Sequence, residues 1–490
     1  MTLTSTPESP VATPRRGLIL LAASLGAFAV FLDNNVVNVA IPTIQHSLHL
    51  SRSGIEWIVS AYILFFAGLL LAGGRLADVL GHRRLFVIGT AVFTAASVLA
   101  GFSNSETMLI SARALQGIGA AMLTPTTLSV ITHAYPEKKE QAKAVGIWGA
   151  VGALALAVGP VLGGTLTQHV SWTWIFFINL PIGLISIALA LYALPRQESL
   201  ARRSIDGPGI AASSLALFGL TFALIQGTHD GWTSSIILGA FALAAIGMVA
   251  FFVRERRASD PMVDLTIFKD RVFVVGSAVL ASWAFGLFGI YFFTAIYLQD
   301  VLGFSPTKAG TAFVPMALLM AVGATIAGSI SHRVRPNRMV ALAMITMGLG
   351  IGATTLVGAH SSFLGLMPAF ALIGAGGGFT VPLGAMVVNT MPPEKASVAS
   401  AIFSATREVA GLLGITIIGV VLSSRENVRL HAGSTSVNAF LSGYRWALIV
   451  AALVVMASGV IAYFGLPRTI DAQTAFDVEP TAADTVLALA

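Results

Sequence analysis

The stretch GLILLAASLGAFAVFLDNNVVNVAIP, residues 17–42, decides the class of this protein. Its single charged side chain is that of Asp33. A helix that crosses a bilayer needs about 20 mostly apolar residues, because the hydrocarbon layer is about 30 Å thick and offers the backbone no hydrogen bonds. The stretch is therefore predicted to be a membrane-spanning helix.

Thirteen more apolar stretches follow along the 490 residues. Hydrophobic residues make up 56% of the chain, charged residues only 10%, and the mean hydropathy is +0.84. This composition indicates an all-α integral membrane protein with fourteen transmembrane helices. We place them at 17–42, 55–78, 84–103, 107–133, 143–167, 174–194, 207–227, 233–253, 272–297, 308–331, 339–358, 362–391, 398–423 and 444–466.

Basic residues gather in every second connection between these stretches. Of the 28 Lys and Arg residues, 21 lie in one set of connections and five in the other. Positive charge is retained on the cytoplasmic side, which predicts a multi-pass membrane protein with both termini in the cytoplasm. The absence of Cys and the preference for Arg and Ala over Lys are compatible with a bacterial plasma or inner membrane. The net charge of +6 is explained by this topology, so no nucleic-acid partner is expected. The absence of Cys excludes disulfides, thiolate catalysis and Cys-based metal sites, and no metal site is predicted.

Asp33 is an ionisable residue inside an otherwise apolar membrane span. Ionisable side chains inside membrane spans are costly and mark functional sites by default. Burial disfavours the charged form of a carboxyl group, which makes Asp33 a candidate proton carrier. The alternative is a structural acid that is permanently paired with a base.

Arg113 is the matching base. It lies about 10 Å from the outer surface on a span of opposite direction, at a depth close to that of Asp33. Gln116 shares its helix face, and Gly117 permits a neighbouring helix to approach closely. We therefore expect an Asp33–Arg113 pair that protonation of the acid would weaken.

Two glycine-containing segments lie outside this pair. The connection after the second span has the ordered pattern Gly-x-x-Asp-x-x-Gly-x-Arg-Arg, which is more specific than a merely basic loop, and Gly81 is expected to end the helix in the left-handed conformation. Its candidate residues are Gly74, Arg75, Asp78, Gly81, Arg83 and Arg84. In the fifth span, Gly159 and Gly163 form a small-xxx-small pair that favours tight helix packing, Pro160 bends the helix, and Gly164 follows directly.

These segments together resemble the major facilitator superfamily, specifically its fourteen-helix drug:proton antiporters. The matching stretches are Asp33–Pro42, Gly74–Arg84, Arg113–Gly119 and Gly159–Gly164. Trp172–Gly183 is similar to a further segment of this branch, with Thr173 in place of the usual Arg, and Tyr297–Gly310 also fits. The corresponding stretch of the second half, Ser329–Arg335, lacks the acid of the loop motif, so we do not expect it to latch the helices as the first-half motif would.

The resemblance implies two six-helix bundles around a cavity that opens alternately to either side. The implied organisation is an N-terminal segment 1–16, a first bundle 17–195, a linker 196–270 with spans seven and eight, a second bundle 271–467 and a disordered tail 468–490. It further implies that Asp33 carries the proton, Arg113 modulates it, and Asp78 with Arg75 latches one closure. No cofactor is expected apart from protons as the coupling ion.

Arg407 and Glu408 form a second charged position near the middle of span thirteen. Adjacent residues point about 100° apart on a helix, so we do not expect them to neutralise one another. Glu408 is either a second protonation or cation site or a partner in a structural pair between helices. Because span ten has no acid, we favour lipophilic monocations or neutral amphiphiles over dications. The candidate substrate-binding residues are Asn34, Asn38, Tyr62, Gln116, Trp148, Phe288, Tyr291, Phe292 and Arg407.

The sequence thus predicts a monomeric, proton-coupled exporter of hydrophobic drugs or toxic compounds, with the bilayer and a small substrate as its partners. A dedicated exporter of one endogenous metabolite or antibiotic has the same motifs. A membrane enzyme or sensor is disfavoured, because no catalytic cluster, no phosphate-binding loop and no soluble signalling domain is present. Three acids, Glu56, Asp230 and Asp300, are expected at the solvated outer rim.

Overall fold

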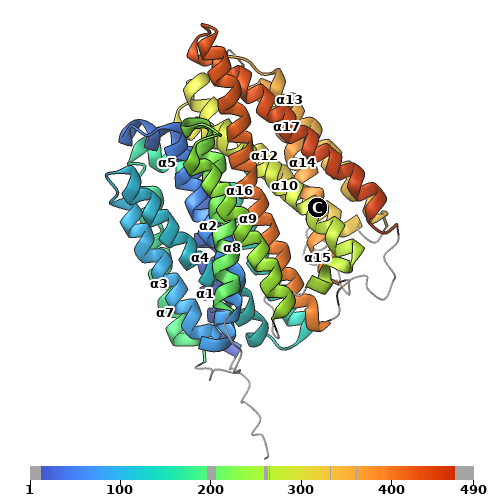
Figure 1. Cartoon of the computed structure of the whole chain (residues 1–490). Helices are drawn as coiled ribbons and strands as arrows, with labels where there is room; N and C mark the ends of the chain where they lie inside the picture. The colour runs from blue at the N-terminus through green and yellow to red at the C-terminus, as the bar shows by residue number, and fades with distance from the viewer. Residues whose placement is uncertain are drawn as a thin grey trace, which may run out of the picture.

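The computed structural model of the chain is a bundle of long helices, with the first half of the sequence on one side and the second half on the other (Figure 1). It describes residues 13–195, 206–258, 263, 265–330, 333–359, 361–380, 382–389, 391 and 393–468. The expected terminal segments 1–16 and 468–490 lie almost entirely outside the described residues.

The helices of the first half and the linker are α1 (Thr13–Leu48), α2 (Arg52–Leu80), α3 (His82–Gly101), α4 (Glu106–Ala134), α5 (Lys138–His169), α6 (Trp174–Phe177), α7 (Asn179–Ala193), α8 (Gly207–Asp230), α9 (Ser235–Arg257) and the 3₁₀ turn η1 (Leu265–Lys269). The second half comprises α10 (Arg271–Ile296), the π-helical turn η2 (Tyr297–Val301), α11 (Pro306–Ala312), α12 (Val314–Ile330), α13 (Pro336–Ala353), the 3₁₀ turn η3 (Thr354–Leu356), α14 (Phe363–Phe379), α15 (Pro382–Asn389), α16 (Pro393–His431) and α17 (Ser436–Gly465).

The predicted all-helical membrane fold is confirmed. Thirteen helical segments of the described chain are long and apolar enough to cross a bilayer, and α14 is a shorter apolar helix. Three expected spans are divided rather than continuous helices. The span at 174–194 is divided at Ile178 into α6 and α7, the span at 308–331 is divided at Phe313 into α11 and α12, and the span at 362–391 is divided after α14.

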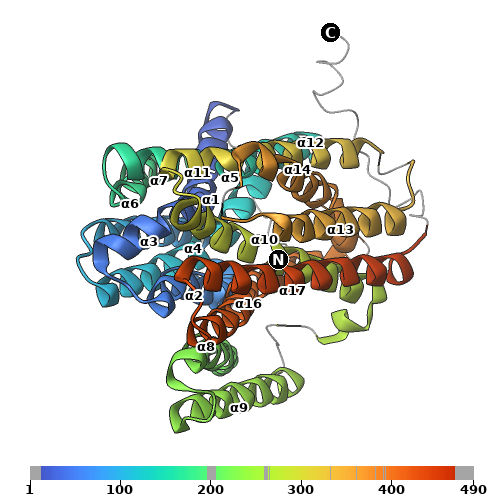
Figure 2. The ribbon, with the colours of Figure 1, turned by 90° about the horizontal axis from the view of Figure 1, so that it is seen from above.

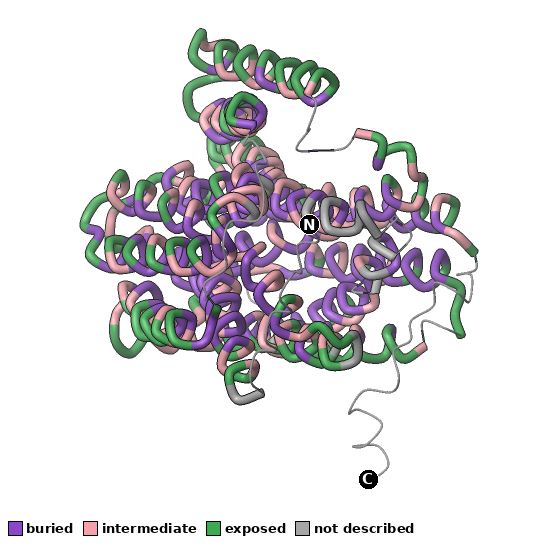
Figure 3. Tube along the Cα trace, turned by 90° about the horizontal axis from the view of Figure 1, so that it is seen from below, coloured by how far each residue is buried: buried purple, intermediate pink, exposed green. Residues whose placement is uncertain are grey.

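The two linker helices lie at the edge of the bundle (Figure 2). Helix α8 packs against α2 and α16, so it contacts both halves, while α9 packs on the far side of α8. Of the residues in α9, only Ile237, Gly247 and Glu255 are buried, and Figure 3 shows its surface as exposed along most of its length. An apolar helix with so little protein around it is suited to contact with lipid.

Helices α2 and α4 of the first half cross at close range. A Cβ atom at Gly117 of α4 would lie 2.4 Å from the carbonyl oxygen of Tyr62 on α2. A Cβ at Gly73 of α2 would lie 2.0 Å from the carbonyl oxygen of Ala121 on α4. Neither distance leaves room for a side chain, so these two helices approach as closely as the sequence at Gly117 predicts.

The molecule has two distinct ends. We call the end at which α1 begins, with Arg16 and Arg83, the basic end, and the other the opposite end. Helices α1, α5 and α16 run from the basic end to the opposite end, and α2 runs back. These directions decide which residues meet at each depth.

Candidate functional site

Asp33 of α1 and Arg113 of α4 form an ion pair inside the first half. The Arg113 Nη1 atom donates to Asp33 Oδ2, and the exposed fractions of the two side chains are 1% for Arg113 and 0% for Asp33. The expectation from matched depth thus corresponds to a direct contact between the two side chains.

Three amide and hydroxyl side chains complete the surroundings of Asp33. Gln116 Nε2 donates to Asp33 Oδ1 at 3.0 Å, and Asn179 Nδ2 of α7 donates to the same oxygen at 3.1 Å. Both amides also donate to the hydroxyl of Ser97 on α3, at 2.8 and 3.3 Å. Four helices therefore supply side chains to one carboxylate site.

The guanidinium of Arg113 is fixed on its other sides as well. Its Nε donates to the carbonyl oxygen of Ile58 at 3.1 Å, and its Nη1 also donates to Gln116 Oε1 at 2.9 Å. The Tyr62 ring lies 4.3 Å from the guanidinium carbon, within cation–π range. Loss of the charge on Asp33 would therefore disturb contacts on α1, α2 and α4 together.

The sequence did not single out Asn179 and Ser97 as members of this site. Asn179 lies inside the Trp172–Gly183 segment on which part of the resemblance rests. As a polar residue in an apolar span, it could have been predicted to belong to a polar site. Ser97 gave none, because a buried serine commonly bonds its own helix, as it also does here to Phe93.

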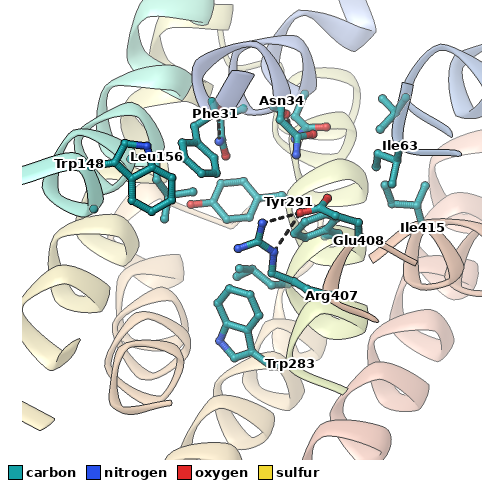
Figure 4. A pocket seen from close by; sticks show the side chains of 17 residues that line it. Phe31, Asn34, Ile63, Trp148, Leu156, Trp283, Tyr291, Arg407, Glu408 and Ile415 are labelled. Atoms are coloured by element: carbon teal, nitrogen blue, oxygen red, sulfur yellow. Dashed lines mark hydrogen bonds and ion pairs between the residues drawn. The ribbon is translucent and has the colours of Figure 1, made fainter. Parts of the chain in front are cut away.

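A cavity of about 420 Å³ lies between the two halves (Figure 4). Helices α1, α2 and α5 form one wall, and α10 and α16 form the other. The lining residues are Phe31, Asn34, Asn35, Asn38, Val59, Ile63, Trp148, Gly149, Gly152, Leu156, Trp283, Leu287, Phe288, Tyr291, Arg407, Glu408 and Ile415. Asp33 is not among them, although its neighbours in sequence, Asn34 and Asn35, are.

Six of the nine candidate substrate-binding residues lie on this wall: Asn34, Asn38, Trp148, Phe288, Tyr291 and Arg407. The other three lie elsewhere. Tyr62 and Gln116 are buried in the ion-pair network, and Phe292 is buried with its ring 4.8 Å from that of Phe293. The reason is helix rotation, since each of the three occupies a face of its helix that packs inside one half.

The relation between Arg407 and Glu408 differs from the expectation. The Arg407 Nε and Nη2 atoms donate to Glu408 Oε1 at 2.9 and 2.6 Å, so the adjacent residues do form an ion pair. The 100° between their Cβ directions does not prevent this, because the long arginine side chain folds across to the shorter glutamate. Figure 4 shows both side chains at the cavity.

Several buried polar atoms on the cavity wall have no hydrogen-bond partner within the described part of the chain. They are Asn38 Oδ1, Trp148 Nε1, Tyr291 OH and Glu408 Oε2. Burying polar atoms without partners is unfavourable, and such atoms in a ligand cavity are suited to bond an incoming molecule. The set contains two acceptors on Asn38 and Glu408, one donor on Trp148 and a hydroxyl that can do either.

A seam between the two halves closes the opposite end, and the Gly-Pro segment of α5 is part of it. A Cβ at Gly164 would lie 2.2 Å from the carbonyl oxygen of Pro306 in α11. Conversely, a Cβ at Gly310 of α11 would lie 2.1 Å from the carbonyl oxygen of Pro160. Gly159 and Gly163 face the other way and pack on Asn35 and Val36 of α1.

Polar contacts reinforce this seam. Arg52 of α2 pairs with Glu426 of α16 at 3.0 Å, and Gln299 Nε2 donates to the carbonyl oxygen of Val39 at 2.7 Å. The Thr307 N–H donates to Gln168 Oε1 at 3.1 Å. All of these contacts join the first half to the second at the opposite end.

The order of residues along each helix places the cavity next to the seam, towards the basic end. On α1 the cavity residues at 31–38 precede the seam residue Val39, and on α5 those at 148–156 precede Pro160. On α16 those at 407–415 precede Glu426. The seam therefore separates the cavity from the opposite end.

The loop motif lies at the basic end of the first half. Gly81 ends α2 with φ 85° and ψ 139°, a positive φ that glycine adopts without strain, although its ψ differs from the expected left-handed value. Arg83 Nη2 donates to the carbonyl oxygen of Leu191 at 2.6 Å, while Arg84 is exposed and a Cβ at Gly74 would meet no atom within 4 Å. Arg75 is half-buried on α2, and the side chain of Asp78 lies outside the described residues.

Comparisons with known proteins place the sequence among transporters. The family model described as Major Facilitator Superfamily matches residues 23–415. The multidrug resistance protein Stp of Mycobacterium tuberculosis is 33% identical over 83% of this chain and 76% of its own length. The puromycin resistance protein pur8 of Streptomyces alboniger is 33% identical over 92% and 91%, and the tetracenomycin C resistance and export protein of Streptomyces glaucescens is 33% identical over 86% and 79%.

Solved structures agree on the fold. A bacterial homologue of the human lysosomal transporter Spinster, in an inward-facing and unoccupied conformation, superposes with a TM-score of 0.64. The match covers 93% of this chain and 97% of the homologue at 17% identity.

Proposed function

Because the chain belongs to the major facilitator superfamily, and is therefore a membrane transporter and not an enzyme, we propose that it exports a hydrophobic compound in exchange for protons. The observation that carries the proposal is the buried Asp33–Arg113 pair, which adjoins the cavity wall through Asn34 and Asn35. The names of the relatives, which refer to multidrug resistance and to antibiotic export, support efflux as the direction.

Proton coupling follows from the chemistry of the pair. Ionised Asp33 holds Arg113, Gln116 and Asn179 around it. Protonation removes the charge that Arg113 faces and replaces an acceptor by a donor, so α1 and α4 lose their strongest attraction. Because the pair joins two helices of one half, its titration biases how that half packs. No cofactor other than the proton takes part in this scheme.

The cavity favours lipophilic monocations and neutral amphiphiles. Arg407 already neutralises one oxygen of Glu408, which leaves Oε2 as the sole acidic acceptor on the described wall. Five aromatic rings on the wall offer flat apolar contacts, and a bound cation gains cation–π attraction from them. They belong to Phe31, Trp148, Trp283, Phe288 and Tyr291. A dication would leave one charge without a partner, which is costly in a desolvated site.

The orientation follows from the distribution of basic residues. We assign the basic end to the cytoplasm of a bacterial cell, both termini included, and the opposite end to the outside. With the seam closed, the cavity then adjoins the cytoplasmic side. A single chain contains both halves of the cavity, so the monomer is the transporting unit.

A dedicated exporter of one endogenous antibiotic is the second candidate, and the names of the relatives from Streptomyces favour it. Substrate range separates it from a broad drug pump. A broad pump accepts many chemically distinct fluorescent cations at similar affinity, whereas a dedicated exporter accepts one scaffold.

The test is reconstitution in proteoliposomes with an imposed pH gradient and a panel of fluorescent lipophilic cations. Asp33→Asn is expected to abolish gradient-driven transport while the folded protein is retained. Asp230→Asn is the control, because it removes an exposed carboxylate at the end of α8. Gradient-driven transport by Asp33→Asn at the wild-type rate would refute the proposal.

A further inference from the structure

Glu56 of α2 is a buried carboxyl group that the scheme above does not use. It was expected at the solvated rim, but its exposed fraction is 4%. It has no hydrogen-bond or ion-pair partner within the described part of the chain. It also does not line the cavity, whose nearest member on the same helix is Val59.

The group that covers Glu56 belongs to the other half of the molecule. A Cβ atom at Gly419 of α16 would lie 2.7 Å from Glu56 Oε1 and 3.0 Å from Oε2. Both carboxyl oxygens therefore rest in the notch that this glycine leaves. The seam between α2 and α16 thus closes directly over the acid, and opening the seam would expose it to water.

The charged groups around Glu56 do not compensate for this burial. On α2 itself, Arg52 forms an ion pair with Glu426 of α16 at 3.0 Å. The remaining titratable and charged groups at this end of the helices packed against α2 are the exposed Arg425, Arg429 and His431 on α16, Glu106 on α4, His229 and Asp230 on α8, and His46 on α1. His229 pairs with Asp230, His46 with Asp300, and Arg425 lies over Trp446.

We propose that Glu56 is a second proton-binding group, neutral while the seam is closed and ionised when α2 and α16 separate. A carboxylate without a partner is not stable in such a site, so the group neutralises instead. When the seam opens, water solvates the group and the proton leaves to the outer solution. Closing the seam takes up that proton again, so acid on the outer side favours closure and alkali favours opening. This proton is not carried across the membrane.

The proposal rests on alternating access of the proposed exporter, but its test is separate from proton coupling at Asp33. The chain has no cysteine, so spin labels can be placed at two exposed positions of the opposite end, Val170→Cys after α5 and Val437→Cys in α17. Distances between the labels in lipid nanodiscs then report the open and closed populations as a function of pH.

In the labelled protein that keeps Glu56, opening the seam releases one proton. The ratio of open to closed molecules should therefore rise about tenfold per pH unit, at pH values between those at which Glu56 ionises in the open and in the closed state. Glu56→Gln keeps the shape of the neutral acid and cannot ionise, so the slope of the logarithm of this ratio against pH is expected to fall by about one. Asp230→Asn, at the same end but outside the seam, is expected to leave the slope unchanged.

A second pair of variants tests the notch. Gly419→Ala would push the carboxyl group out of its place and is expected to raise the open population at every pH. Adding Glu56→Ala makes room for the new methyl group and is expected to restore closure without restoring the pH slope.

Binding of a fluorescent cation in the cavity, which Glu56 does not line, shows that each variant is folded. If Glu56→Gln keeps the wild-type slope, this inference is overturned, whereas the exporter proposal stands or falls with Asp33→Asn.

Discussion

Two ion pairs of the described residues, Asp33–Arg113 beside the cavity and Arg407–Glu408 on its wall, are built differently. In the first half, Asp33 and Arg113 come from different helices, both are almost fully buried, and amides from α4 and α7 complete the surroundings of the acid. In the second half, Arg407 and Glu408 are neighbours on α16, Arg407 is 33% exposed, and Glu408 Oε2 has no partner among the described residues.

This difference indicates different tasks. A pair between two helices changes the attraction between them when it is titrated, so it can drive a rearrangement. A pair within one helix cannot move that helix relative to another, but its unsatisfied oxygen can recognise a ligand. We therefore expect substitutions in the first pair to affect coupling, and substitutions in the second to affect substrate affinity and selectivity.

The largest effect is expected for Arg113→Ala. Removing one partner of a buried ion pair leaves the other charge without compensation, which typically costs about 3–5 kcal/mol. Gradient-driven transport should fall by at least about a hundredfold, which corresponds to the lower part of that range. Rates under an imposed pH gradient measure this.

Arg113→Lys is the matched control for charge. An ammonium retains the positive charge but lacks the planar fork that reaches Asp33, Gln116 and Ile58 together, so it should restore transport only in part. Full rescue by Lys would mean that charge alone is sufficient and that the geometry of the guanidinium is not needed.

The next effect is expected for Glu408→Gln. The substitution removes the charge that attracts cations but keeps a hydrogen-bonding group of the same shape. Hydrogen bonds to charged groups contribute about 1.5–3 kcal/mol, so the KM for a lipophilic monocation should rise by about tenfold or more, with kcat little changed. Transport of a neutral amphiphile of similar size serves as the control, and its KM should hardly move. An equal loss for both substrates would place Glu408 in proton coupling instead.

The sequence predicted the spans and the first pair well because both depend on properties that act along the chain. Long apolar runs fix the helices, and two full-length antiparallel helices place residues of equal depth side by side, as Asp33 and Arg113 are.

The sequence did not predict features that depend on the length of a side chain or on how a helix is rotated about its axis. The 100° between Arg407 and Glu408 is the angle between their Cβ directions, and it does not show how far the arginine side chain can extend. The faces taken by Tyr62, Gln116 and Phe292 depend on packing within one half. The break at Phe313 and the burial of Glu56 depend on contacts between elements far apart in sequence.

A smaller effect is expected for Asn179→Ala, which tests the environment of the first pair without breaking it. The carboxylate of Asp33 loses one of its donors. Gradient-driven transport should therefore fall about threefold to tenfold, since one neutral hydrogen bond contributes about 0.5–1.5 kcal/mol. Ser97→Ala is the control, because Ser97 contacts the two amides and not Asp33. A wild-type rate in Asn179→Ala would contradict the role of Asn179 as a donor that holds Asp33 in place.

The smallest effect is expected for Trp148→Phe on the cavity wall. The indole ring lies 6.2 Å from that of Phe31 in an edge-on arrangement, and its Nε1–H has no partner within the described chain. Phenylalanine keeps most of the aromatic contact and removes only the donor, and one neutral hydrogen bond contributes about 0.5–1.5 kcal/mol. A substrate with an acceptor group should bind up to about tenfold more weakly, whereas a substrate that lacks acceptors should be unaffected. Equilibrium fluorescence titration of the two ligands against the purified variant measures the difference. If affinity for both falls equally, Trp148 acts through its ring alone, and recognition by hydrogen bonding is then confined to the α1, α10 and α16 walls.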